Sequence, residues 1–163
     1  MSAVPEMQSM DQIISEQPFF QGLEVDAIAL IAGCAKNEHV VAGAYLFREG
    51  EDADVFFVVR HGRVALELHS PSGGTRLLDT VEEGEVLGWS WLVPPHQWFL
   101  DARAVDEVSV VSIDARCLRG KCDQDPALGY ALLQRVTRVM YHRLQSARVR
   151  LLDMYGSPRD AVH

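Results

Sequence analysis

The 163-residue sequence lacks a long apolar segment, and this absence excludes two classes of protein. No part of it approaches the roughly 20 consecutive apolar residues that a membrane-spanning helix requires. Residues 1–10 also have neither the basic start nor the apolar run of a secretory signal peptide. We therefore expect a cytoplasmic protein that makes no contact with a membrane.

Cysteine is scarce as well. Cys34, Cys117 and Cys122 are too few and too scattered for a disulfide framework. Cys117 and Cys122 are not spaced as the close C-x₂-C pair of a zinc site, and an iron–sulfur cluster usually takes four thiolates. We predict reduced thiols, no metal site and no cofactor.

Positive charge is in deficit, because the net charge at pH 7 is −8. This balance argues against general affinity for nucleic acid. The deficit is uneven, since residues 126–152 contain five arginines and no acidic residue. A basic C-terminal segment is therefore joined to an acidic body. Its arginines form either a solvated face or a surface that docks on acidic groups, on this chain or on a partner.

A catalytic constellation is also missing. Ser90 and Ser109 have no nucleophile motif around them, so we do not predict an enzyme. The composition is that of an ordinary globular protein, with 48% hydrophobic and 23% charged residues. The length suits one domain with some extension at its ends.

Three segments have the apolar periodicity of helices. Residues 7–16 predict a short helix that ends at Gln17-Pro18, because the residue before proline disfavours helical geometry. Residues 23–35 predict a second helix, with Gly33 near its end. Residues 126–152 predict a third helix of ~40 Å, which is longer than a small domain can cover.

Between these segments the sequence is rich in valine and aromatic residues, separated by glycine-rich and acidic turns. The pattern predicts about eight short strands in an antiparallel sandwich or roll. The predicted strands are His39–Val41, Tyr45–Phe47, Val55–Val59, Val64–Leu68, Arg76–Leu78, Val86–Leu87, Phe99–Val105 and Val108–Ile113.

One stretch carries a family resemblance. Residues 43–64 read GAYLFREGEDADVFFVVRHGRV, in which Gly43, Gly50 and Gly62 punctuate strands and Phe56–Val59 suggests a strand buried on both sides. This stretch resembles the first signature of the cyclic nucleotide-binding domain family, which includes bacterial catabolite-activator-like regulators. The resemblance extends over roughly residues 13–152.

The resemblance implies a mainly β fold, an eight-stranded antiparallel jelly roll with N-terminal helices and a long C-terminal helix. We divide the chain into an N-terminal segment (1–18), the jelly roll (19–124), the long helix (125–155) and a tail (156–163). The tail is far too short for the helix-turn-helix domain of the family's transcription factors, so we expect no DNA-binding domain and no direct DNA binding.

The family's phosphate-binding cassette places a glutamate on the ribose and an arginine on the cyclic phosphate. Here Gly88 and Ala104 fall into register, and Trp89 then occupies the glutamate position and Trp98 the arginine position. Arg103 lies five residues beyond Trp98, which strand alternation would place on the opposite face. The candidate ligand-binding residues are Gly88, Trp89, Ser90, Trp91, Trp98 and Phe99.

Three interpretations of the cassette remain open. The tryptophans fill a vestigial pocket and convert it into core, or they stack on a different planar ligand, or a compensating residue preserves cyclic-nucleotide binding. Loss of the arginine would weaken binding of a cyclic monophosphate by ~30- to several-thousand-fold. Haem-binding relatives suggest a further option, with His96, His61 or His69 as an axial ligand, but the ligand spacing is absent.

In the family, the helix after the roll commonly forms a dimer interface. We expect the same here, and the candidate residues are Leu132, Val136, Val139, Met140, Leu144, Ala147 and Leu151. The sequence thus predicts a dimeric, non-catalytic regulatory, sensor or adaptor module that does not bind cAMP or cGMP in the usual way. The alternatives are a sensor of a nucleotide or other planar ligand, and an accessory subunit of a larger enzyme complex with a protein partner.

Overall fold

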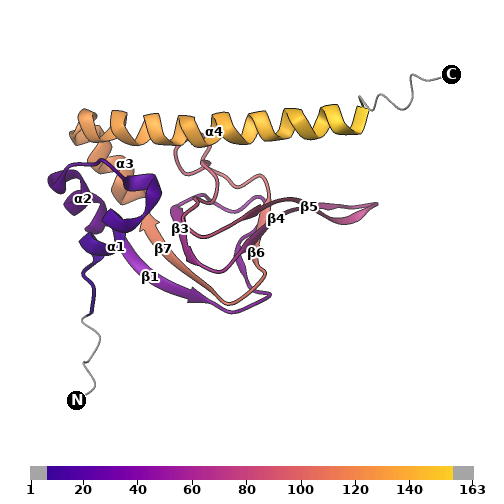
Figure 1. Ribbon diagram of the computed structural model, residues 1–163, viewed down its shortest axis with the longest axis horizontal. Helices are drawn as coiled ribbons and strands as arrows, with labels where there is room; N and C mark the ends of the chain where they lie inside the picture. Colours follow the sequence, from indigo (N-terminus) through magenta and orange to yellow (C-terminus); the bar gives the residue numbers. More distant parts are fainter. Residues whose placement is uncertain (1–6, 156–163) are drawn as a thin grey trace, which may run out of the picture.

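The computed structural model describes residues 7–155, and it begins with helices that gather at one end of the molecule (Figure 1). Helix α1 (Met10–Glu16) starts at a capping box, in which the Ser9 hydroxyl accepts from the Gln12 backbone N–H at 3.3 Å. It ends before Pro18, as predicted. The short 3₁₀ helix η1 (Pro18–Phe20) and helix α2 (Val25–Ala32) follow.

Seven strands form two antiparallel sheets. The three-stranded sheet has the order β1-β7-β3, and the four-stranded sheet has the order β2-β6-β4-β5. The strands are β1 (Ala35–Val40), β2 (Tyr45–Phe47), β3 (Val55–His61), β4 (Val64–Ser70), β5 (Gly74–Val81), β6 (Asp101–Ala104) and β7 (Val108–Asp114). The arrangement confirms the predicted jelly roll with flanking helices.

One of the eight predicted strands is wrong. Val86 forms only an isolated bridge with Val58, although Leu87 N donates to the Phe57 carbonyl at 3.0 Å. Gly84 and Gly88 bracket this segment, with φ of 85° and 67°, and their left-handed backbone keeps it from extending into a strand. Within residues 7–155, no helix combines the length and apolar character needed to cross a bilayer.

A helix that the sequence did not predict precedes the long one. Helix α3 (Ala115–Gln124) buries only Ala115 and Leu118, and most of its other residues are polar or charged, so few apolar residues mark it in the sequence. The Asp114 side chain caps it by accepting from Cys117 N at 3.0 Å. Helix α4 (Pro126–Tyr155) then runs across the roll, above the loops between β5 and β6 and toward the β4–β5 hairpin (Figure 1).

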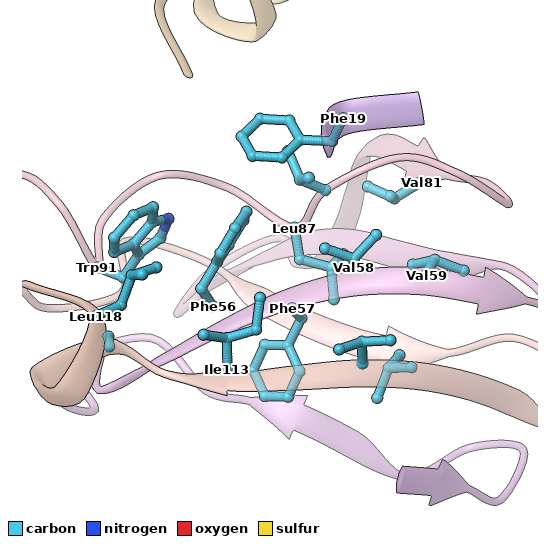
Figure 2. Packing of buried hydrophobic residues seen from close by; sticks show 14 of the residues in the cluster. Phe19, Phe56, Phe57, Val58, Val59, Val81, Leu87, Trp91, Ile113 and Leu118 are labelled. Atoms are coloured by element: carbon cyan, nitrogen blue, oxygen red, sulfur yellow. The ribbon is translucent and has the colours of Figure 1, made fainter. Parts of the chain in front are cut away.

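One apolar core includes buried residues from both sheets of the roll and from the helices packed against it. All four residues of Phe56–Val59 are buried, which confirms the predicted two-sided burial of this strand. Phe56 contacts Phe19 and Phe20 edge-on on one side, and Trp91 stacks on it with a centroid distance of 4.6 Å (Figure 2). Trp91 and Leu118 of α3 belong to the same buried cluster, so the predicted cassette is joined to this core.

The prediction of three reduced thiols is wrong for two of them. Cys34, between α2 and β1, forms a disulfide with Cys117 of α3, with a Cα–Cα distance of 5.9 Å. Cys122 is the free cysteine, and burial raises the pKa of its thiol, with Asp123 and Asp125 nearby adding to the effect. Sequence spacing could not indicate the bond, because its two halves come from elements 83 residues apart.

Candidate functional site

The predicted cassette lines a cavity of about 540 Å³ between the roll and the second half of α4. Five of the six candidate residues contribute to its wall, namely Gly88, Trp89, Ser90, Trp98 and Phe99. The segment from 88 to 100 consists of turns, without the short helix that the family cassette would have. Its backbone therefore offers no helix N-terminus to a phosphate.

Trp98 is packed into the wall of this cavity. Its side chain is 4% exposed, and its ring stacks on Phe47 of β2 with a centroid distance of 3.7 Å and an interplanar angle of 6°. A Cβ atom on Gly88 would lie 3.2 Å from the Trp98 ring, and φ at Gly88 is 67°. Glycine at position 88 therefore lets the chain turn beside the indole.

Trp89 and Phe99 have a different exposure. Trp89 is half-buried in the cavity wall, and Phe99 is 68% exposed at its edge. Aromatic side chains with this much apolar surface in contact with water gain free energy when a further molecule covers them. The indoles of Trp89 and Trp98 therefore occupy part of the pocket and leave the 540 Å³ cavity beside them unfilled.

Trp91 does not belong with the other cassette residues. We expected it in the ligand pocket, but it lies outside the cavity lining and is fully buried against Phe56 (Figure 2). Arg119 of α3 donates to the Trp91 carbonyl oxygen, which fixes the turn that carries it. The side chain of Trp91 therefore anchors the cassette to the core.

The opposite wall of the cavity contains an ion cluster that the sequence did not predict. Arg143 and Arg150 of α4 both contact Asp79 of β5, at 3.0 Å and 3.3 Å. The arginines are seven residues apart and so share one helix face, but nothing local in the sequence identifies Asp79 as their partner. Of the two alternatives for the arginine segment, docking on this chain's own acidic groups applies to this pair.

Arg103 does not compensate for the missing cassette arginine. Its Nε donates to Glu67 Oε1 at 2.8 Å across the β4–β6 pair, and this bond raises the pKa of the Arg103 guanidinium. Glu67 is 6% exposed, so Arg103 neutralises a buried carboxylate. The residue lies outside the cavity lining, in accordance with the strand-alternation argument.

The structure divides the predicted dimer stripe of α4 among three environments. Leu132 and Val136 are buried within this chain, and Val139 packs against the same core, which corrects their assignment to a dimer interface. Ala147 and Leu151 line the cavity. Met140 and Leu144 are 37% and 51% exposed. Helix length alone could not show which residues the roll would cover.

The described residues offer no cluster for a metal ion. No group of three histidine, cysteine, aspartate or glutamate side chains within residues 7–155 is arranged to hold one. His61 contacts Glu83 at 3.6 Å, and His69 contacts Thr75 and Asp101 at 2.6 Å and 3.0 Å. Neither of these histidines nor His96 lines the 540 Å³ cavity.

The jelly roll, the cassette and the helix that covers them are the features that assign this protein to a family. A family model described as the cyclic nucleotide-binding domain matches residues 37–125, more than half of the 163 residues. The chain belongs to the cyclic nucleotide-binding domain family.

Individual relatives agree with this assignment. The CRP-like cAMP-activated global transcriptional regulator of Mycobacterium tuberculosis is 28% identical over 145 residues, which cover 89% of this chain and 63% of the regulator. The chain therefore spans less than two thirds of that relative's length. A crystal structure from Geobacter metallireducens, described as a cyclic nucleotide-binding protein, has a TM-score of 0.75 and 28% identity and covers 85% of this chain and 99% of its own.

A more distant neighbour shows the fold alone. The regulatory subunit of a cAMP-independent protein kinase A from Trypanosoma brucei has a TM-score of 0.69 and 16% identity, and the match covers 86% of this chain and 49% of the subunit. A variant of that subunit with three substitutions, one of them threonine to arginine, was solved with cAMP bound in its A site.

Proposed function

We propose that the chain is a non-catalytic regulatory module whose cassette does not hold cAMP or cGMP by the usual pair of charged side chains. The observation that carries this proposal is the placement of Trp98. At the position where the family resemblance puts an arginine, a buried indole stacks on Phe47. A cyclic phosphate would meet an aromatic ring there, without a guanidinium to pair with.

The second missing charge supports the same conclusion. Trp89 stands at the glutamate position and faces the cavity without a carboxylate for a ribose hydroxyl. Arg103 is engaged with Glu67 elsewhere. The cAMP-independent regulatory subunit from Trypanosoma brucei supports the idea that the fold can serve regulation without cAMP.

Titration of the chain with cAMP and cGMP tests this proposal. We expect affinities weaker by ~30- to several-thousand-fold than those of a domain with an intact arginine–phosphate pair. Tryptophan emission is a suitable readout, because Trp89 and Trp98 both line the cavity, and calorimetry gives an independent value. Tight binding of cAMP by the wild-type chain would contradict the proposal.

The double substitution Trp89→Glu with Trp98→Arg is expected to increase cAMP affinity by at least ~30-fold, because it restores the hydrogen-bonding and charged groups together. The cAMP-bound variant of the Trypanosoma brucei subunit, which also introduces an arginine, supports this design. Trp91→Phe is the matched control and should gain nothing, since residue 91 lies outside the cavity. If the double variant folds but gains no affinity, the positions are misassigned.

A sensor for a different ligand is favoured over a fully vestigial pocket. Had the indoles converted the site into core, no cavity of about 540 Å³ would remain beside them. A volume of this size is typical of sites for small organic molecules. We therefore include the detection of a small molecule in the proposed regulatory role.

The exposed side of α4 is proposed as a homodimer interface. Three apolar residues lie within about 20° of one line along the helix, by the 100° turn per residue. They are Leu133, Met140 and Leu144, and their exposure ranges from 37% to 51%. This outer face of α4 is distinct from the face that packs on the roll, and a two-fold axis would bury it against its own copy.

Introducing a charge on the outer face should dissociate the dimer. Leu144→Glu places a carboxylate in the proposed apolar contact, and we expect the dissociation constant to rise at least ~30-fold, since an uncompensated buried charge costs several kcal/mol. Sedimentation analysis across a concentration series measures this change. Gln134→Glu, an exposed site on another side of α4, adds the same charge as a control. A wild-type chain that remains monomeric at high concentration would contradict the interface.

A further inference from the structure

The ion cluster in the cavity wall is not electrically balanced. Arg143 Nη1 lies 3.0 Å from Asp79 Oδ2, and Arg150 Nη2 lies 3.3 Å from Asp79 Oδ1. One carboxylate thus serves two guanidinium groups. The remaining terminal nitrogens donate to the carbonyls of Val86 and Leu78, which are dipoles and carry no compensating charge.

Among the described residues that line the cavity, no other side chain is ionisable in the ordinary pH range. The wall is otherwise apolar or hydroxyl-bearing, so the cluster leaves one net positive charge facing it. The Arg143 side chain is only 17% exposed and that of Arg150 is 56% exposed. Contact with solvent at Arg150 screens this charge, and a ligand that covered Arg150 would have to neutralise it.

The two sides of the cavity differ in character. The cassette side, from Gly88 to Leu100, contributes aromatic and aliphatic surface and the Ser90 hydroxyl, without a charged group in the lining. The α4 side holds both arginines. An anionic group in this cavity is therefore favoured beside α4, which is opposite to the polarity that a cassette arginine would impose.

We propose that this cavity binds a planar, largely apolar organic molecule with one negative charge. Its anionic group faces Arg143 and Arg150, and its ring system covers Trp89 and Phe99. The proposal rests on the regulatory function proposed above and specifies the chemical class of the ligand. A volume of about 540 Å³ accommodates a molecule of two or three rings.

A matched pair of fluorescent probes tests the charge requirement. 1-Anilinonaphthalene-8-sulfonate is an aromatic monoanion, and N-phenyl-1-naphthylamine has the same rings without the sulfonate. We expect one anilinonaphthalenesulfonate to bind per chain, roughly tenfold tighter than the neutral probe at low salt, because hydrogen bonds to charged groups contribute on this scale. Added salt should reduce this preference, as it screens the partly exposed arginine.

Two charge variants of the ion cluster should shift the preference for the anionic probe in opposite directions. Arg150→Gln removes the net charge and should abolish the preference for the anionic probe. Asp79→Asn leaves two arginines unopposed and should strengthen anion binding several-fold, an increase that a merely damaged site would not produce. Arg148→Gln, an exposed position on the same helix outside the cavity lining, is the control and should leave both affinities unchanged.

An occluding variant separates cavity binding from adsorption elsewhere. Ala147→Trp fills the cavity from α4 and should abolish binding of both probes, while near-ultraviolet circular dichroism reports whether the fold persists. Equal affinities for the two probes, or an anion preference that survives Arg150→Gln, would overturn the assignment of charge and leave the sensor function standing. Failure of both probes to bind would overturn the ligand site and with it the sensor role.

Discussion

Loss of the Cys34–Cys117 disulfide is expected to lower the free energy of unfolding by about 4–5 kcal/mol, the chain-entropy value for a loop closed over 83 residues. The bond joins the residue before β1 to α3, so most residues of the roll lie in the loop that it closes. Without the bond, this loop gains conformational freedom in the unfolded chain. Urea unfolding of the wild-type chain with and without a dithiol reductant measures this effect. A cavity of about 580 Å³ is lined by both cysteines.

Cysteine variants identify the bond as the source of the change. Cys34→Ser and Cys117→Ser should each lose similar stability, and the double variant should lose little more, because either single change already breaks the bond. Cys122→Ser removes the free thiol and should remain sensitive to the reductant. An unfolding midpoint that does not respond to reduction in the wild-type chain would show that the disulfide does not form in solution.

Truncating Trp91 is the second change with a large expected effect. Trp91→Ala should lower the free energy of unfolding by about 3–5 kcal/mol, as is typical for a buried aromatic residue replaced by alanine. The side chain is fully buried and stacks on Phe56 (Figure 2). The variant leaves a cavity at the point where the cassette joins the core, and denaturant unfolding measures its cost.

Two control variants distinguish the core-packing role of Trp91 from the cavity-lining role of Trp89. Trp91→Phe keeps an aromatic ring against Phe56 and removes an indole N–H that has no hydrogen-bond partner among the described residues. It should therefore lower the free energy of unfolding much less than Trp91→Ala does. Trp89→Ala truncates a half-buried ring at the open cavity, and its cost should also be smaller. If Trp89→Ala proved as destabilising as Trp91→Ala, the separate roles given to the two tryptophans would be wrong.

The local patterns of the sequence predicted much of the fold. The buried strand at Phe56–Val59 and the helix stop before Pro18 depend on short-range periodicity and backbone preference, which neighbouring residues determine. The first family signature identified the family, which the match over residues 37–125 shows. Trp89 and Trp98, which the register assigned to one pocket, both line the 540 Å³ cavity, and their role in ligand binding stays a prediction.

Other features required the tertiary structure. Helix α3 was not predicted, because it buries only Ala115 and Leu118 and depends on a cap at Asp114 and on its neighbours. The predicted tail at 156–163 and the first residues of the N-terminal segment lie outside the described residues, and the division of the chain into these segments remains a prediction.

The sequence by itself determined which residues share a helix face or a strand face, because the turn per residue is a property of the backbone. Only the tertiary structure decided what lies against each face. In the folded protein, Leu132 is buried within the chain, Leu144 is exposed, and Asp79 contacts Arg143. Cys34 is bonded to Cys117, and Trp91 lies outside the cavity that Trp98 lines. These contacts join residues far apart in the chain, and no local periodicity specifies which distant element will cover a given side chain.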